Sequence, residues 1–140
     1  MLYLFNSPLG PISYDWDGHT CHRIWLDDRA TTSQRDDVSQ WFQAYFQGDV
    51  LSLPKLATAK TAFQKRMRDE LITIKLGSTS TYGEFAKILK TSPRALGQAL
   101  GANPFLIMVP CHRILSLNGL GGFAFGLPWK QKLLAFENDS

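Results

Sequence analysis

Apolar and polar residues alternate through the first 26 positions of the chain, as is typical of β-strands. The segments LYLFNSP and PISYDW show this alternation, and Asp17-Gly18 is a hairpin-turn signal ahead of a third segment, HTCHRIWL. Aromatic residues between positions 41 and 46 then follow at helical spacing, and Gly48 suits the end of that helix. The pattern predicts a small sheet followed by one helix.

Beyond residue 60 the apolar positions recur every three or four residues, which predicts helices. Capping boxes that open at Thr61 and Thr81 mark where two of these helices begin. We therefore expect an α+β fold in two parts. A small, reduced N-terminal domain over residues 1–54 would be built on a β-hairpin or sheet. A mainly helical C-terminal domain over residues 55–140 would contain a helix-turn-helix.

The helix-turn-helix is predicted from two short helices, the first of which opens at Thr81, separated by a tight turn at the segment KTS, residues 90–92. Its second helix has Ser92 as N-cap, Pro93 as first helical residue and Gly101 as its stop. Two leucines of this helix share the face that should point to the core. The opposite face has little bulk, and it consists of Arg94, Gly97, Gln98 and Gly101. We interpret it as a face that enters a nucleic-acid groove, the alternative being a surface helix weakened by glycines.

The charge distribution supports a polyanionic partner. The net charge is +3, but residues 1–54 carry three basic and seven acidic side chains, whereas residues 55–94 carry nine basic and three acidic ones. A basic middle segment of this kind fits nucleic acid, although a lysine-rich helical surface would look the same.

Several classes of protein are not expected from this chain. No apolar run is long enough to span a bilayer, and the N-terminus lacks the features of a signal peptide. Two cysteines do not make a disulfide framework, so we expect a cytoplasmic protein whose thiols stay free. The segment HTCH places His19, Cys21 and His22 together, but strand alternation puts His22 on the other side, and we expect no metal site.

The segment MVPCHRIL places Cys111 directly before His112. A cysteine becomes a nucleophile when a base and an orienting group stand beside it. Adjacent side chains of an extended segment point apart, so a water would have to bridge the two residues. Glu137, on a helix predicted near the C-terminus, could orient His112. From this pair alone, a buried structural cysteine beside a surface histidine remains the simpler alternative.

PCHRIL resembles the active-site motif of the O6-alkylguanine-DNA alkyltransferases. The resemblance extends through TAFQKRM, STSTYGEFAKIL, RALGQALGANP, GGFAFGLPWKQKLLAFE and the N-terminal SPLGPISYDWDG, and so covers nearly the whole chain. It implies a DNA-repair enzyme that flips the damaged nucleotide out of the duplex. The alkyl group of O6-alkylguanine, with O4-alkylthymine as a second candidate substrate, then passes once to the protein's own cysteine. It also implies a monomer that acts on double-stranded DNA without a cofactor.

The resemblance also implies roles for individual residues. Cys111 would accept the alkyl group, and His112 would activate it through water while Glu137 orients the imidazole. Asn103 would hold the helix-turn-helix to the active-site turn by hydrogen bonds. Tyr82 would bind the extruded base, and Arg94 would fill the gap that it leaves in the duplex. The DNA backbone or groove would be contacted by Gln64, Ser92, Gly97 and Gln98. The base pocket would be lined by Ala124 and Phe125.

One of these residues departs from the family's pattern. Phe125 stands where glycine is common. Its ring could point into the pocket and narrow it, or point outward as a lid, and of the two we favour the inward position. Two other readings of the chain stay open. One is a non-catalytic sensor of alkylated bases, although such relatives resemble PWHR rather than PCHR. The other is a helix-turn-helix transcription regulator, which would need neither Cys111 nor His112.

Overall fold

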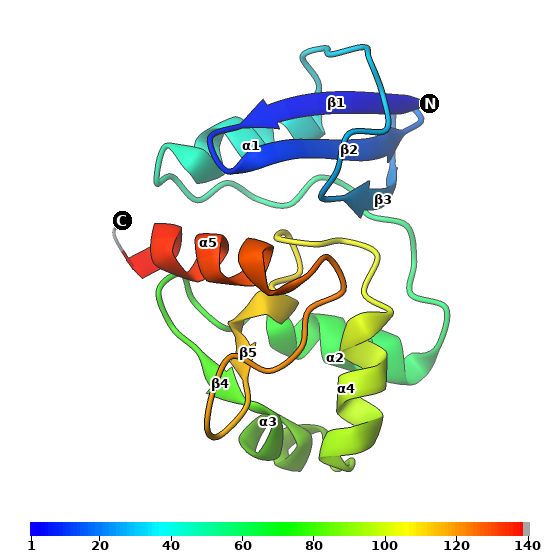
Figure 1. Cartoon of the computed structure of the whole chain (residues 1–140). Coiled ribbons are helices and arrows are strands. Elements are labelled where there is room, and N and C mark those ends of the chain that lie inside the picture. Colours follow the sequence, from blue (N-terminus) through cyan, green and yellow to red (C-terminus); the bar gives the residue numbers. More distant parts are fainter. Residues whose placement is uncertain (139–140) are drawn as a thin grey trace. The chain divides into compact units, whose positions relative to one another are not determined.

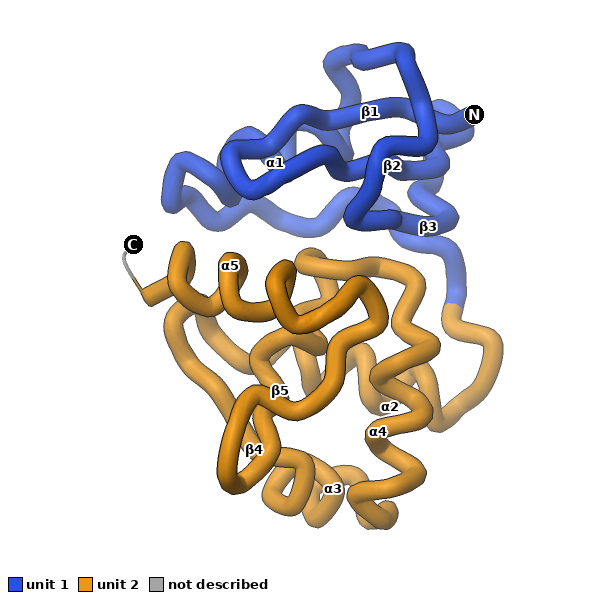
Figure 2. Tube along the Cα trace, viewed as in Figure 1, with its two compact units in different colours: residues 1–58 blue, residues 59–140 orange. Residues whose placement is uncertain are grey.

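The computed structural model describes residues 1–138, and the chain divides into two compact units, residues 1–58 and 59–140 (Figures 1 and 2). The boundary lies four residues beyond the one expected from the sequence. In chain order the elements of the first unit are β1 (Leu2–Ser7), β2 (Gly10–Trp16), β3 (Cys21–Trp25) and α1 (Asp37–Phe46). Those of the second are α2 (Ala62–Leu71), β4 (Ser80–Thr81), α3 (Tyr82–Leu89), α4 (Pro93–Gly101), the 3-10 helix η1 (Cys111–Arg113), β5 (Ile114–Leu115) and α5 (Leu127–Asn138). This arrangement confirms the predicted α+β class.

The first unit is an antiparallel sheet, in the order β1-β2-β3, with α1 packed against it. Phe5 of β1 lies over Phe42 of α1, with the two ring centroids 5.6 Å apart. The helix begins at Asp36, whose carboxylate accepts a hydrogen bond from the Ser39 amide and another from the buried Tyr14 hydroxyl, at 2.7 Å. Burial raises the pKa of Tyr14, so the phenol stays a neutral donor. One carboxylate therefore both starts α1 and ties it to β2.

The second unit has the helix starts that the sequence predicts. Thr61, Thr81 and Ser92 are the N-caps of α2, α3 and α4, and each side chain accepts the backbone N–H three residues on. Between α3 and α4, Lys90 adopts a left-handed conformation with φ of 55° and makes the tight turn. The two helices pack together as the expected helix-turn-helix.

Helix α4 ends at Gly101, as predicted, but the prediction that this glycine terminates the helix through a left-handed conformation is wrong. Gly101 is helical, the cap is Ala102 with φ of −95°, and neither adopts a left-handed conformation. The helix ends because Asn103 precedes Pro104, and a residue before proline is disfavoured in the helical region. The Asn103 side chain then accepts the Phe105 amide at 3.0 Å, which turns the chain towards Cys111.

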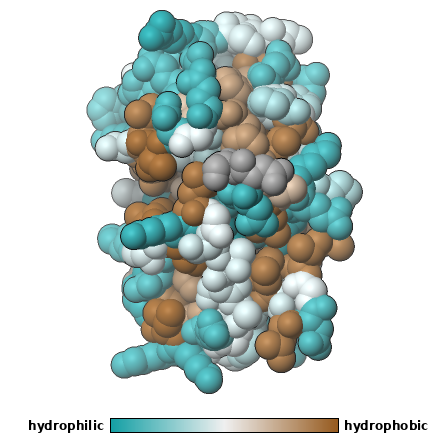
Figure 3. All heavy atoms as spheres, turned by 90° about the vertical axis from the view of Figure 1, so that its left-hand side faces the viewer, coloured by the Kyte–Doolittle hydropathy of each residue, from teal (hydrophilic) through white to brown (hydrophobic). Residues whose placement is uncertain are grey.

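The surface of the protein mixes apolar and polar residues. On the face drawn in Figure 3, apolar side chains lie scattered among hydrophilic ones. Within residues 1–138, no helix combines the length and the apolar character that crossing a membrane requires. The inner face of α5 is unusual because Lys130 and Glu137 are buried there beside Leu133.

Replacing Tyr14 by phenylalanine should remove the bond to Asp36 and lower the free energy of unfolding by about 1 kcal/mol, the usual net contribution of such a bond. Urea denaturation followed by fluorescence measures this change. Tyr3→Phe is the control, because the Tyr3 hydroxyl donates, within residues 1–138, to the exposed Met1 sulfur alone, and its effect should be close to zero. Equal losses in both variants would show that the Tyr14–Asp36 bond does not hold α1 to the sheet.

Candidate active site

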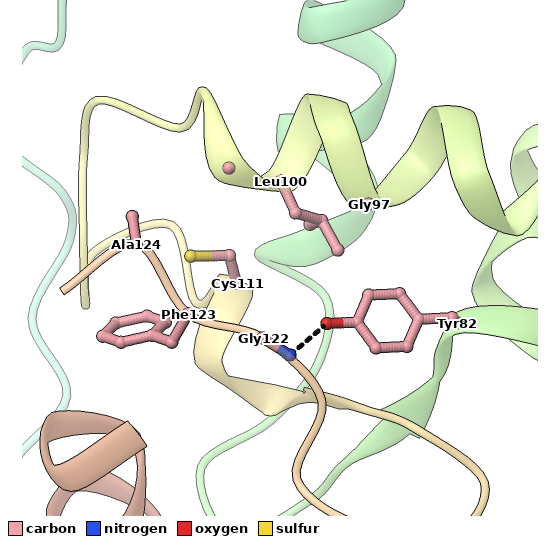
Figure 4. Close-up of a pocket in the computed structure, with 8 residues that line it drawn as sticks. Tyr82, Gly97, Leu100, Cys111, Gly122, Phe123 and Ala124 are labelled. Carbon is pink, nitrogen blue, oxygen red and sulfur yellow. Dashed lines mark hydrogen bonds between the residues drawn. The ribbon is translucent and has the colours of Figure 1, made fainter. Parts of the chain in front are cut away.

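Cys111 begins η1 directly after Pro110, and its thiol faces a small pocket of about 190 Å³. Figure 4 shows the side chain between α4 and the loop that carries Gly122, Phe123 and Ala124. The residue is buried, with 6% of its surface exposed, so a reactant reaches the sulfur only through this pocket. The lining residues come from α3, α4, η1 and the loop before α5, and they are Tyr82, Gly97, Leu100, Gly101, Cys111, Gly122, Phe123 and Ala124.

His112 and Glu137 form the buried pair that the sequence predicts. His112 Nε2 lies 2.7 Å from Glu137 Oε2, and both side chains are almost fully enclosed. Burial lowers the pKa of His112, while the carboxylate acts in the opposite direction, so the imidazole rests in its neutral form. The neutral ring donates its Nε2 proton to Glu137. Nδ1 is thus the basic nitrogen, and among the described residues it has no hydrogen-bond partner.

Arg113 completes this pair and had no role assigned from the sequence. Its Nε and Nη2 donate to the two oxygens of Glu137 at 2.8 and 3.0 Å, and Nη1 donates to the Ile74 carbonyl at 2.6 Å. A bidentate arginine fixes a carboxylate in both position and charge. The signal was present in the motif, where the arginine directly follows Cys-His.

Asn103 connects the end of α4 to the turn before Cys111. Its Nδ2 donates to the Val109 carbonyl at 2.9 Å, and its Oδ1 accepts the Phe105 amide. Burial raises the pKa of the Cys111 thiol, whereas the Asn103 amide and the positive charge of Lys130 act against that rise. Asn103 thus holds the loop in place and also favours ionisation of the thiol.

Tyr82 stands at the first position of α3, and its hydroxyl accepts the Gly122 N–H at 3.1 Å (Figure 4). The approach requires glycine at position 121. The backbone there has φ of +75°, and a Cβ would lie 2.6 Å from the Tyr82 ring. The close contact between this loop and the Tyr82 ring therefore depends on the absence of a side chain at position 121.

The small face of α4 lies where the sequence predicts. Leu96 and Leu100 are buried, and a Cβ built on Gly97 or Gly101 would meet no atom within 4 Å. Both glycines border the pocket, so this helix leaves open space beside the thiol. The expected DNA-contacting side chains of α4 and its cap, Ser92, Arg94 and Gln98, are exposed, and Gln64 of α2 is half-buried.

The expectation that Phe125 narrows the pocket is wrong. Ala124 borders the pocket as expected, but the aromatic ring on its wall belongs to Phe123. A turn from Phe123 to Gly126, closed by the Gly126 N–H on the Phe123 carbonyl at 3.0 Å, removes Phe125 from the lining. Gly126, with φ of +92°, permits this turn, which a count of positions along the loop could not show.

The histidines near the N-terminus take part in local contacts. His22 Nε2 lies 2.7 Å from Asp17, and His19 Nδ1 lies 3.1 Å from the Thr20 hydroxyl. Cys21 is buried, and burial raises its pKa to about 12. In the part of the chain that the structure describes, no three His, Cys, Asp or Glu side chains gather in a way that could hold a metal ion.

The fold and the pocket together define a class of protein in which one enclosed cysteine, here Cys111, lies in a pocket beside a helix-turn-helix. A family model described as "6-O-methylguanine DNA methyltransferase, DNA binding domain" matches residues 62–139. The methylated-DNA–protein-cysteine methyltransferase of Sulfolobus acidocaldarius is 38% identical, over 96% of this chain and 90% of its own length. The enzyme of the same name from Saccharolobus solfataricus is 36% identical, over 96% and 93%.

Solved structures agree with these sequence relatives. The Mycobacterium tuberculosis OGT in complex with DNA superimposes with a TM-score of 0.85 at 30% identity, over 99% of this chain and 92% of that one. The O6-methylguanine-DNA methyltransferase of Pyrococcus kodakaraensis gives 0.81 at 28% identity, over 98% and 99%. The chain belongs to the methylated-DNA–protein-cysteine methyltransferase family.

Substituting Gly121 by alanine should push the Tyr82 ring away and strain the backbone, at a cost of roughly 1–3 kcal/mol in unfolding free energy. The bond from the Gly122 amide to the tyrosine should be lost with it. Thermal unfolding and amide exchange at Gly122 measure the two effects. Gly119→Ala is the control, since its nearest neighbour is the Ser116 hydroxyl at 3.6 Å. An unchanged Gly122 amide in Gly121→Ala would contradict the fitted contact.

Proposed function

We propose that this protein repairs double-stranded DNA by moving the alkyl group of O6-alkylguanine onto Cys111 Sγ. The observation that carries the proposal is the enclosed thiol at the pocket, with His112 and Glu137 directly behind it. In the transfer, the thiolate attacks the alkyl carbon, a C–S bond forms, and the bond from that carbon to O6 breaks. The thioether product has no route back to a thiol, so each molecule acts once.

The proton of Cys111 leaves by way of His112. Nδ1 of the neutral imidazole is the atom that would accept it, through one bridging water, while Glu137 stabilises the imidazolium that forms. Arg113 holds the Glu137 carboxylate in place by donating to both of its oxygens. Guanine departs as a developing anion, and the Tyr82 hydroxyl, whose oxygen already accepts the Gly122 amide, has its proton available for the base.

The reactive carbon is hidden inside a stacked base pair, so the nucleotide must rotate into the pocket at a cost of a few kcal/mol. The open face of α4 supports this step, because Gly97 and Gly101 let the DNA backbone come close and Arg94 stands exposed at the helix start. We propose that α4 enters the minor groove and that Arg94 fills the gap left by the flipped base. Gln64, Ser92 and Gln98 would contact the backbone.

The protein would work in the cytoplasm, since the proposed chemistry requires a reduced thiol and both cysteines are free. It would work as a monomer, because one chain supplies the pocket and the His112–Glu137 pair. A non-catalytic sensor is disfavoured because it would have no use for the thiol or for the buried His112–Glu137 pair behind it.

Mixing the protein with O6-methylguanine duplex DNA should add the mass of one methyl group per molecule, on the peptide that contains Cys111. Intact-mass and peptide mass spectrometry measure this. Cys111→Ala should take up no methyl group and still bind DNA. Cys21→Ala is the matched control and should react like the wild type, because that thiol lies in the other unit. Methyl loss from DNA without a change in protein mass would overturn the proposal.

Arg94→Ala should slow transfer from duplex DNA roughly tenfold or more, about 1.4 kcal/mol in the barrier. The reason is that no side chain would then fill the gap left by the flipped base. Transfer from free O6-benzylguanine should stay unchanged, since no base has to leave a duplex. Glu137→Gln should slow both reactions alike, because it acts on proton removal. Single-turnover rates on the two substrates, below the unfolding temperature of each variant, separate these cases. Equal losses on both substrates in Arg94→Ala would show that Arg94 does not act in extrusion.

A further inference from the structure

The turn between α3 and α4 is made by a lysine in a strained backbone conformation (Figure 1). Lys90 has φ of 55° and ψ of 48°, and its amide donates to the Lys87 carbonyl at 3.1 Å. The Thr91 amide donates to the Ala86 carbonyl at 2.9 Å. This is the Schellman arrangement, whose left-handed position is normally glycine because a Cβ is disfavoured there. A lysine makes the turn less stable than a glycine would, and this cost points to a role for its side chain other than forming the turn.

The Lys90 side chain makes no polar contact with the rest of the described protein. It is exposed, and within residues 1–138 its ammonium has neither a hydrogen bond nor an ion pair. A lysine that stabilised the native state would be expected to contact a carboxylate or the last carbonyls of a helix. The ammonium is therefore available to an anion from outside the chain.

The backbone around Lys90 is fixed from two directions. On one side the guanidinium of Arg66, from α2, donates to the Leu89 carbonyl directly before the lysine. On the other side Ser92 caps α4 by accepting the Ala95 amide at 3.0 Å. The turn is thus ordered before any ligand arrives, and binding at this position would not have to order a loop.

No acidic residue lies near Lys90 along the chain on its C-terminal side. Between Glu84 and Glu137 the sequence contains six basic side chains and no acidic one. Those of α3, the turn and α4 are exposed, and they are Lys87, Lys90 and Arg94. Because Arg94 follows Lys90 by four residues, their backbones lie within about 14 Å of each other, and one DNA strand can meet both. A strand that reaches Arg94 therefore passes a second cation that is not paired with a carboxylate.

We propose that Lys90 binds a backbone phosphate of duplex DNA, and that the strained lysine anchors the strand beside α4. The inference rests on the proposed function, since it takes DNA as the ligand. It adds to the interface a residue that the small face of α4 did not indicate. Binding to undamaged duplex DNA is enough to test it. A wild type that binds DNA without accepting an alkyl group would therefore overturn the proposed function alone.

The test is the affinity for an undamaged DNA duplex, measured by fluorescence anisotropy at several salt concentrations. Lys90→Gly should weaken binding about three- to tenfold near 0.1 M salt, and the slope of log affinity against log salt should become less steep by about 0.9, the value for one phosphate contact. The same variant should unfold at a temperature about 2–4 °C higher, because glycine relieves the left-handed strain. Weaker binding by a more stable protein cannot result from misfolding.

Lys90→Arg keeps the charge and should keep the wild-type slope, whereas Lys90→Asn, which also tolerates the left-handed conformation, should bind like the glycine variant. Lys75→Asn is the matched control. It removes an exposed lysine of the same unit that follows Ile74, whose carbonyl Arg113 holds, and its slope should not change. A Lys90→Gly variant with the wild-type affinity and slope would overturn the proposal. An equal loss in Lys75→Asn would do the same, since both lysines would then act only through net charge.

Discussion

The carboxylate of Glu137 is the constraint on which the reactive site depends. It accepts hydrogen bonds from His112 on one side and from Arg113 on both oxygens, and all three side chains are buried. Removing the carboxylate would leave a buried guanidinium unpaired, which is far more costly than losing an exposed ion pair. The same contact fixes the tautomer of His112. The placement of α5 against η1 and the proposed chemistry at Cys111 thus depend on the same interaction.

The pocket depends equally on where side chains are missing. Gly97 and Gly101 leave space on α4, and Gly121 lets the loop approach Tyr82 more closely than any residue with a Cβ would allow. These glycines weaken helix and loop, because glycine loses more backbone entropy on folding than other residues do. The N-caps at Thr81 and Ser92 offset part of that loss in the two helices that meet at the pocket.

Local features such as helix caps were predicted well from the sequence, whereas contacts between residues far apart in the chain were predicted only in part. Caps at Thr61, Thr81 and Ser92 were readable because each depends on residues within one turn. The His112–Glu137 contact was first raised as a possibility because Glu137 lies on the predicted last helix, and the resemblance to a known family then implied it. Lys130 was missed because a lysine in a helix is normally exposed, and only the packing of α5 shows that this one is not. Phe125 was misplaced because the turn at Gly126 changes which loop residues face the pocket.

The buried state of Cys111 suits a protein that would react only once. Burial raises the pKa of the thiol and so favours its protonated form, and a protonated thiol is a poor target for oxidants and stray electrophiles. An exposed cysteine with a lowered pKa would react with such compounds more readily. In the proposed mechanism the thiolate would form as the proton passes to His112, whose Nδ1 has no partner within residues 1–138. In the proposed transfer, the negative charge that the sulfur gives up would pass to the departing base.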